Sequence, residues 1–265
     1  MKTEIINHRS GLQITFIILI IIIAAFLIYY SVMSVLGPAK KMEALINEFG
    51  AKTTQNPIDE AIISDSTYLS LLREKSFLQS RVVMAGTDSI YITISLPDST
   101  VNVEISGVTV HTSKINDFKI SSILEEGNKN IILSMFGAPL SIVNDYSTIR
   151  KEPVLIKMAP KDTSEYIPDV MPDTSITEPV NYILEMTHGI RIYVHQSETE
   201  NFSGKLNLFW FDTRYLLHDT WRELKDIVAF KIPEYHPFIK IHLPRADAKI
   251  IYRALPRYGQ IGMYK

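Results

Sequence analysis

The sequence predicts an α+β protein dominated by strands, with an N-terminal transmembrane helix and a short helical stalk. Two observations predict it: residues 12–36 carry no charge, and at Ser89 the apolar residues change from a helical period to strict alternation, which then recurs towards the C-terminus. The expected organisation is a cytoplasmic tail at 1–11, a transmembrane helix at 12–36, a stalk at 38–82 and an extracytoplasmic α+β domain at 89–265.

The composition excludes several classes of protein. Hydrophobic residues make up 46% of the 265 residues and charged residues 21%, so the chain is not a disordered tail. The net charge of -2 argues against the strong basic field of a nucleic-acid-binding protein. Cysteine is absent, which excludes disulfides, cysteine-ligated zinc, Fe–S clusters and thiol nucleophiles. We therefore expect no cofactor and no nucleic-acid partner.

The uncharged run at 12–36 is long enough to cross a membrane. At about 1.5 Å per residue, a helix over this range exceeds a bilayer core of about 30 Å. A cleaved signal peptide is the alternative, but its apolar region spans only about 7–15 residues. Lys2 and Arg9 precede the run and Lys40 and Lys41 follow it, so the charge rule is nearly tied. The short tail and the large following domain favour a single-pass protein of the bacterial inner membrane, with its C-terminal domain in the periplasm.

Two helices are expected between the membrane and the domain. Pro38 can begin a helix over 40–49, which Gly50 can end. Asp65 can cap a second helix that runs to about Val82. This stalk either self-associates as a short coil, which would give a homo-oligomer, or packs on the domain that follows it.

Alternating segments predict most of the sheet. A three-stranded meander is expected at 90–96, 101–105 and 108–110, and a hairpin is expected from 180–186 and 190–195. Between them, residues 153–179 contain five prolines, which predict an extended connection rather than a helix or a central strand.

The last third of the chain is expected to alternate strands and helices. We expect a strand at 206–211, followed by a helix that Asp212 caps. In that helix, Leu217, Trp221, Leu224 and Val228 have the spacing of one buried stripe. A strand at 238–243, a helix that Pro244 opens and Pro256 ends, and a final strand at 261–264 complete the domain.

The strand at 238–243 carries the candidate binding site. His236, Phe238, Lys240 and His242 should point to one side of the strand, because side chains alternate along it. This row either lines a cleft, with Lys240 between two imidazoles, or forms the solvent face of an amphipathic strand. No histidine spacing predicts a metal site, and no glycine-rich phosphate loop or GxSxG motif is present.

Two segments resemble the catalytic domain of L,D-transpeptidases. Residues 90–96 (IYITISL) and 103–110 (VEISGVTV) are similar to the opening hairpin of that family, and residues 241–256 (IHLPRADAKIIYRALP) resemble the stretch that follows its Ser-His-Gly-Cys-Ile-Arg motif. With Leu243-Pro244 as the fixed point, the family's cysteine falls on Lys240, its arginine on His242, its histidine on Phe238 and its glycine on Ile239.

The resemblance implies a degenerate domain that keeps a β-rich fold but lacks the catalytic cysteine. The family's acyl transfer needs a thiolate, which this chain cannot supply. We therefore expect a membrane-anchored, non-catalytic envelope protein that binds peptidoglycan or acts as a scaffold for other envelope proteins. The alternative is a cell-wall-acting enzyme whose active site includes Lys240, His236 and His242.

Overall fold

The computed structural model describes residues 2–53, 66–151, 178–198, 202–229 and 231–265. They form two compact units. One comprises the described residues up to Glu48 together with Tyr215–Tyr235, and the other comprises Phe49–Arg214 and His236–Lys265. The proline-rich connection expected at 153–179 lies outside the described residues, apart from residues 178–179.

The N-terminal helix is much longer than the sequence predicts. Helix α1 runs from Lys2 to Thr53 without a break and contains Pro38, so the expected helix start at Pro38 and end at Gly50 are both wrong. Proline removes one helical hydrogen bond and glycine costs about 1 kcal/mol relative to alanine. Neither effect ends a helix that is supported by many turns on both sides.

A single helix within the described residues is long and apolar enough to cross a membrane. This candidate span is Phe16–Gly50, and its most apolar 18-residue window has a mean hydropathy of 2.8 with none of its residues buried inside the protein. A fully exposed apolar helix is unfavourable in water, since each large apolar side chain gains about 1.5–3 kcal/mol on burial. These features support membrane anchoring through α1.

Helix α6, Phe202–Val228, corrects three expectations about its region. The strand expected at 206–211 is helical, and Asp212 lies inside the helix instead of capping it. The expected buried stripe faces outwards, with Leu217, Trp221 and Val228 exposed by 62%, 61% and 62%. Three successive aromatic residues at 209–211 favour a strand when judged by local propensity. The helical spacing of Leu217 and Trp221 nevertheless continues back through Trp210 to Leu206.

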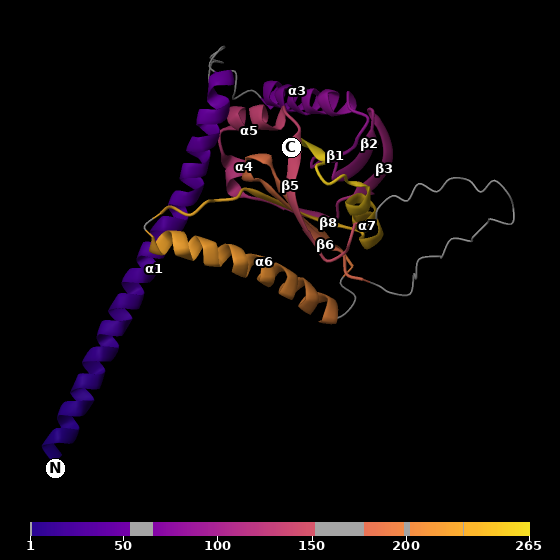
Figure 1. Cartoon of the computed structure of the whole chain (residues 1–265). Helices are drawn as coiled ribbons and strands as arrows, with labels where there is room; N and C mark the ends of the chain where they lie inside the picture. The colour runs from indigo at the N-terminus through magenta and orange to yellow at the C-terminus, as the bar shows by residue number, and fades with distance from the viewer. Residues whose placement is uncertain (1, 54–65, 152–177, 199–201, 230) are drawn as a thin grey trace, which may run out of the picture. The chain divides into compact units, whose positions relative to one another are not determined.

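The second unit is built on a nine-stranded mixed sheet, which makes the protein a mixed α/β fold (Figure 1). Its spatial order is β3-β2-β1-β9-β5-β6-β7-β8-β4. The strands are β1 (Ile90–Ser95), β2 (Thr100–Ile105), β3 (Val108–Lys114), β4 (Asp117–Ile120), β5 (Leu140–Ser147), β6 (Asn181–Met186), β7 (Arg191–Gln196), β8 (Phe238–Leu243) and β9 (Gln260–Tyr264). The other elements of this unit are α3 (Ser66–Ala85), α4 (Ser122–Glu126), α5 (Lys129–Phe136), α7 (Arg245–Ala254) and the short 3₁₀ helix η2 (Thr187–Gly189).

Several predicted strands and one helix are confirmed. Strands β1, β2 and β3 form the expected antiparallel meander, and β6 and β7 form the expected hairpin. Strand β8 has the predicted bounds, Pro244 caps α7, and β9 closes the chain. The sheet is mixed because β1 pairs with β9, and β7 with β8, in parallel.

Helix α3 packs on the sheet domain, so a separate stalk is not confirmed. It lies against β9 and α5 (Figure 1) and buries Leu69, Ser76, Ser80 and Met84. A Cβ atom at Gly262 of β9 would lie only 2.6 Å from the Met84 methyl carbon. Glycine at this position therefore lets α3 approach the sheet closely.

Candidate functional site

Strand β8 presents the predicted polar row on one face of the sheet. Phe238, Lys240 and His242 are half-buried, while the residues between them, Ile239 and Ile241, are each only 1% exposed. The alternation is thus confirmed for the three residues within the strand. It arises because one face of the strand contributes to the hydrophobic core.

The neighbouring parallel strand β7 adds two rings to this row. Tyr193 is paired in register with Lys240, and His195 with His242. The Lys240 Nζ lies 5.5 Å from the centroid of the Tyr193 ring, and the two imidazole centroids are 5.6 Å apart. The imidazole closest in register to His242 is therefore that of His195.

His236 is separated from the other predicted site residues. It precedes β8, where its Nδ1 lies 3.2 Å from the carbonyl oxygen of Gly189, the last residue of η2. Since a strand rises by about 3.3 Å per residue, His236 and His242 are about 20 Å apart along the chain. His236 is therefore not among the residues that contact Lys240 and His242 in the described interactions, which include those of Tyr193, His195 and Asp212.

Asp212 of α6 places a carboxylate beside Lys240 and His195, and Asp117 Oδ2 of β4 lies 3.9 Å from His242 Nδ1. Asp212 Oδ2 lies 3.5 Å from Lys240 Nζ, and Asp212 Oδ1 lies 3.8 Å from His195 Nε2. The Asp212 side chain is 26% exposed. Burial raises the pKa of Asp212, and the positive charge of Lys240 acts in the opposite direction.

His195 is held as a neutral imidazole. Its side chain is 1% exposed, and burial, followed by the positive charge of Lys240 and the proximity of His242, lowers its pKa to about 3. Its Nδ1 lies 3.4 Å from Asn181 Oδ1 on the adjacent strand β6. The tautomer that donates from Nδ1 to Asn181 leaves the Nε2 lone pair directed towards Asp212.

Three buried polar atoms in this cluster have no hydrogen-bond partner within the part of the chain that the structure describes. They are His195 Nε2, Asp212 Oδ1 and His242 Nδ1. Buried polar atoms without a partner are rare and cost about 1–3 kcal/mol each. Together with the Lys240 ammonium, they form a polar cluster at the edge of the sheet's core. We call His195, Asp212, Lys240 and His242 the Lys240 cluster.

The sequence alone does not identify His195 or Asp212 as site residues. His195 ends a strand whose parallel pairing with β8 is non-local, and Asp212 comes from a helix that the sequence misplaces. The alternation along residues 190–195 could have placed His195 on the same face as Tyr193, but not beside Lys240. Among the described residues, no group of three or more histidine, aspartate and glutamate side chains is close enough to hold a metal ion.

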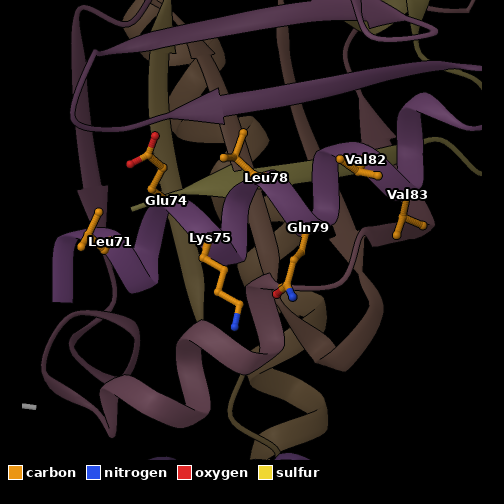
Figure 2. Close-up of a pocket in the computed structure, with 8 residues that line it drawn as sticks. Leu71, Glu74, Lys75, Leu78, Gln79, Val82 and Val83 are labelled. Carbon is orange, nitrogen blue, oxygen red and sulfur yellow. The ribbon is translucent and has the colours of Figure 1, made fainter. Parts of the chain in front are cut away.

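A hollow of about 820 Å³ lies along α3, away from the Lys240 cluster. Figure 2 shows Leu71, Leu78 and Val82 on this helix, and their side chains are exposed by 60%, 44% and 71%. Glu74 and Lys75 lie among them. This surface could carry the self-association expected of residues 38–82, which stays a prediction.

No protein-family model, curated protein or solved structure matches this chain.

Proposed function

We propose that this chain is a membrane-anchored, non-catalytic binding protein of the bacterial cell envelope, whose periplasmic domain contacts peptidoglycan or an envelope complex. The observation that carries the proposal is the Lys240 cluster, in which a cation is surrounded by buried polar atoms without hydrogen-bond partners. Helix α1 supplies the anchor.

The chemistry of the cluster fits a carboxylate with a neighbouring donor group. Lys240 can pair with a ligand carboxylate, while His195 Nε2 and Asp212 Oδ1 can accept hydrogen bonds from a ligand N–H or O–H. Peptidoglycan stem peptides carry both kinds of group. A peptide stem is therefore the ligand that we assign to the site.

The transpeptidase resemblance supports the same location. It assigns the family's nucleophile to Lys240, which lies on β8. The Lys240 side chain is 33% exposed, so its ammonium can pair with a ligand anion in addition to Asp212, from which it is 3.5 Å away. The resemblance thus supports binding of a cell-wall peptide without its acyl transfer.

An enzyme acting on the cell wall is the second candidate. One observation favours it: a neutral imidazole, His195, lies 3.8 Å from an aspartate whose pKa is raised by burial. Two groups with oppositely shifted pKa values are typical of a general acid and base. This site would use His195 and Asp212 beside Lys240 and His242, and it would not include His236.

Co-sedimentation of the full chain in mild detergent with purified peptidoglycan tests the proposal. We expect the wild type to pellet in moderate salt and Lys240→Ala to lose about tenfold or more in affinity, because a hydrogen bond to a charged group contributes about 1.5–3 kcal/mol. Lys114→Ala, at an exposed position on β3, is the matched control and should pellet like the wild type.

The outcomes separate the two candidate functions. If the wild type stays in the supernatant, peptidoglycan is not the ligand. The possibility that the protein is a cell-wall-acting enzyme is tested by mass spectrometry of the peptidoglycan after incubation with the protein. New peptide or glycan products that disappear with Lys240→Ala would support catalysis and contradict a pure binding role.

A further inference from the structure

Helix α6 has an exposed apolar face along most of its length. Leu206, Trp210, Leu217, Trp221 and Val228 follow at intervals of 4, 7, 4 and 7 residues, the spacing of one helical face. Every one of these five side chains is at least 45% exposed, and so are Phe209 and Leu216, which flank the face. We call these seven residues the α6 apolar face.

The other side of the same helix is directed into the protein. Tyr215 is 9% exposed and Ile227 is 1% exposed. Helix α6 therefore has one side that is buried in the protein and a second apolar side, with more large residues, that is exposed. In water alone, exposing two tryptophans, a phenylalanine and three leucines on one helix would be costly, since burial of each such side chain is worth about 1.5–3 kcal/mol.

Contacts within the first unit place the end of α6 at a defined level of α1. The Tyr29 hydroxyl donates a hydrogen bond to the Ile227 carbonyl, with 3.0 Å between the oxygens. Further along α1, a Cβ atom at Gly37 would lie 3.3 Å from the Pro233 carbonyl oxygen. The segment after α6 therefore follows α1 away from the apolar run, towards Lys40 and Lys41, which line a pocket with it.

This level of α1 has the composition of a membrane boundary. The unbroken apolar side chains end near Tyr29, and the first charges after them are Lys40 and Lys41. Tyrosine and tryptophan are enriched where the hydrocarbon core meets the polar headgroups. Within the first unit, the C-terminal part of α6, which carries Trp221, therefore meets α1 at a depth that is favourable for a tryptophan.

We propose that α6 is a membrane-interface helix whose apolar face lies in the headgroup and acyl boundary of the lipid bilayer. Helices of this kind place tryptophan, phenylalanine and leucine about 5–10 Å into the boundary and keep charged residues at the polar edge. Lys225, whose Nζ lies 5.7 Å from the Trp221 ring centroid, has the position of such an edge cation. The ligand of this face is the lipid surface itself.

The inference rests on the membrane anchoring in the proposed function and is independent of the Lys240 cluster. Anchoring by α1 holds α6 at the bilayer at high effective concentration, so the face needs little affinity of its own. A single apolar helix contact that would be weak in solution becomes persistent when a transmembrane segment tethers it.

The two tryptophans of the chain, Trp210 and Trp221, both lie on the α6 apolar face, so tryptophan emission reports this face selectively. The full chain is reconstituted into phosphatidylcholine liposomes with and without bromine atoms on the acyl chains near the headgroup. We expect the brominated lipid to remove most of the emission and aqueous iodide to remove little. Trp210→Phe and Trp221→Phe then report each position separately.

A matched control uses the opposite face of the same helix. With both tryptophans replaced by phenylalanine, Tyr215→Trp introduces the probe at a position that is 9% exposed and directed into the protein. Brominated lipid should quench this probe much less than it quenches the wild-type tryptophans. If the control variant does not fold, the two single-tryptophan chains still test the proposal. In each of them, quenching by brominated lipid is compared with quenching by aqueous iodide.

Three outcomes would overturn the proposal. Strong iodide quenching without lipid quenching would place the face in water. Protection from both quenchers would show that protein covers the face. Failure of the chain to float with the liposomes in a density gradient would remove the anchor itself, whereas loss of peptidoglycan binding alone would leave this inference intact.

Discussion

Acidification from about pH 7 to about pH 4 is expected to lower the free energy of unfolding of the sheet domain by about 3 kcal/mol through His195. The reason is that burial, Lys240 and His242 lower the pKa of His195 to about 3 in the folded chain, while an unfolded histidine titrates near about 6.5. Between these two values the unfolded chain binds a proton that the folded chain does not.

The sign follows from proton linkage. Stability rises with pH wherever the unfolded state binds more protons, so this contribution is fully present above about pH 6.5 and declines as the pH falls towards about 3. Asp212 acts in the opposite direction: its raised pKa favours the folded state at low pH, and this contribution is lost as the pH rises through the folded value. The His195 contribution should dominate because its shift is large and its side chain is only 1% exposed.

Urea unfolding of the full chain in detergent micelles, followed by circular dichroism of the sheet, measures the effect at several pH values. His195→Gln removes the titrating group and should flatten the dependence between about pH 4 and pH 6.5. His236→Gln, at the other end of the same strands, should keep the wild-type slope. Equal slopes for wild type and His195→Gln would contradict the assignment of His195 as a buried neutral imidazole.

Replacing Arg81 by alanine is expected to destabilise the sheet domain by about 3 kcal/mol. Arg81 of α3 donates from Nε to Glu104 Oε2 of β2 at 2.8 Å, and the Glu104 side chain is only 2% exposed. Thr93 donates a second hydrogen bond to the same carboxylate at 2.8 Å. Without Arg81, the neutral hydroxyls of Thr93 and Tyr91 cannot compensate a buried negative charge.

Urea unfolding of the full chain also tests this prediction, and Lys75→Ala provides its control. Lys75 is an exposed cation on the same helix, and its removal should change the free energy of unfolding by less than about 0.5 kcal/mol. The double variant Arg81→Ala/Glu104→Gln should be more stable than the sum of its single changes predicts, because it leaves no buried charge. A loss below about 1 kcal/mol for Arg81→Ala would show that solvent already compensates Glu104.

The sequence predicts the parts of this fold in which burial follows a local rule. Burial alternates along β8 because one face of this strand lies in the core, so the strand is visible in the order of its residues. In β1 and β7 the residue types also alternate, but nearly every residue is buried, so both faces of these central strands are covered. Proline and an acidic first turn mark α7 in the same local way. The uncharged run before Leu36 gives the candidate membrane span for a similar reason, since length and apolarity are properties of the segment alone.

The candidate site could be predicted only in part. Alternation along β8 places Phe238, Lys240 and His242 on one face. It cannot show that β7 pairs in parallel with β8 and so brings His195 beside His242, because strand pairing joins residues distant in sequence. It also cannot show that Asp212 reaches Lys240 from α6.

By itself, the sequence determined the candidate membrane span, most of the strands and the polar face of β8, because each depends on the period and polarity of neighbouring residues. The tertiary structure decided which side chains meet at Lys240 and which face of α6 is covered. The stripe through Leu217 and Trp221 illustrates the difference: its spacing predicts an apolar face in a helix, yet these residues are 62% and 61% exposed. An apolar period specifies only that a face avoids water, and the surroundings decide whether protein or lipid covers it.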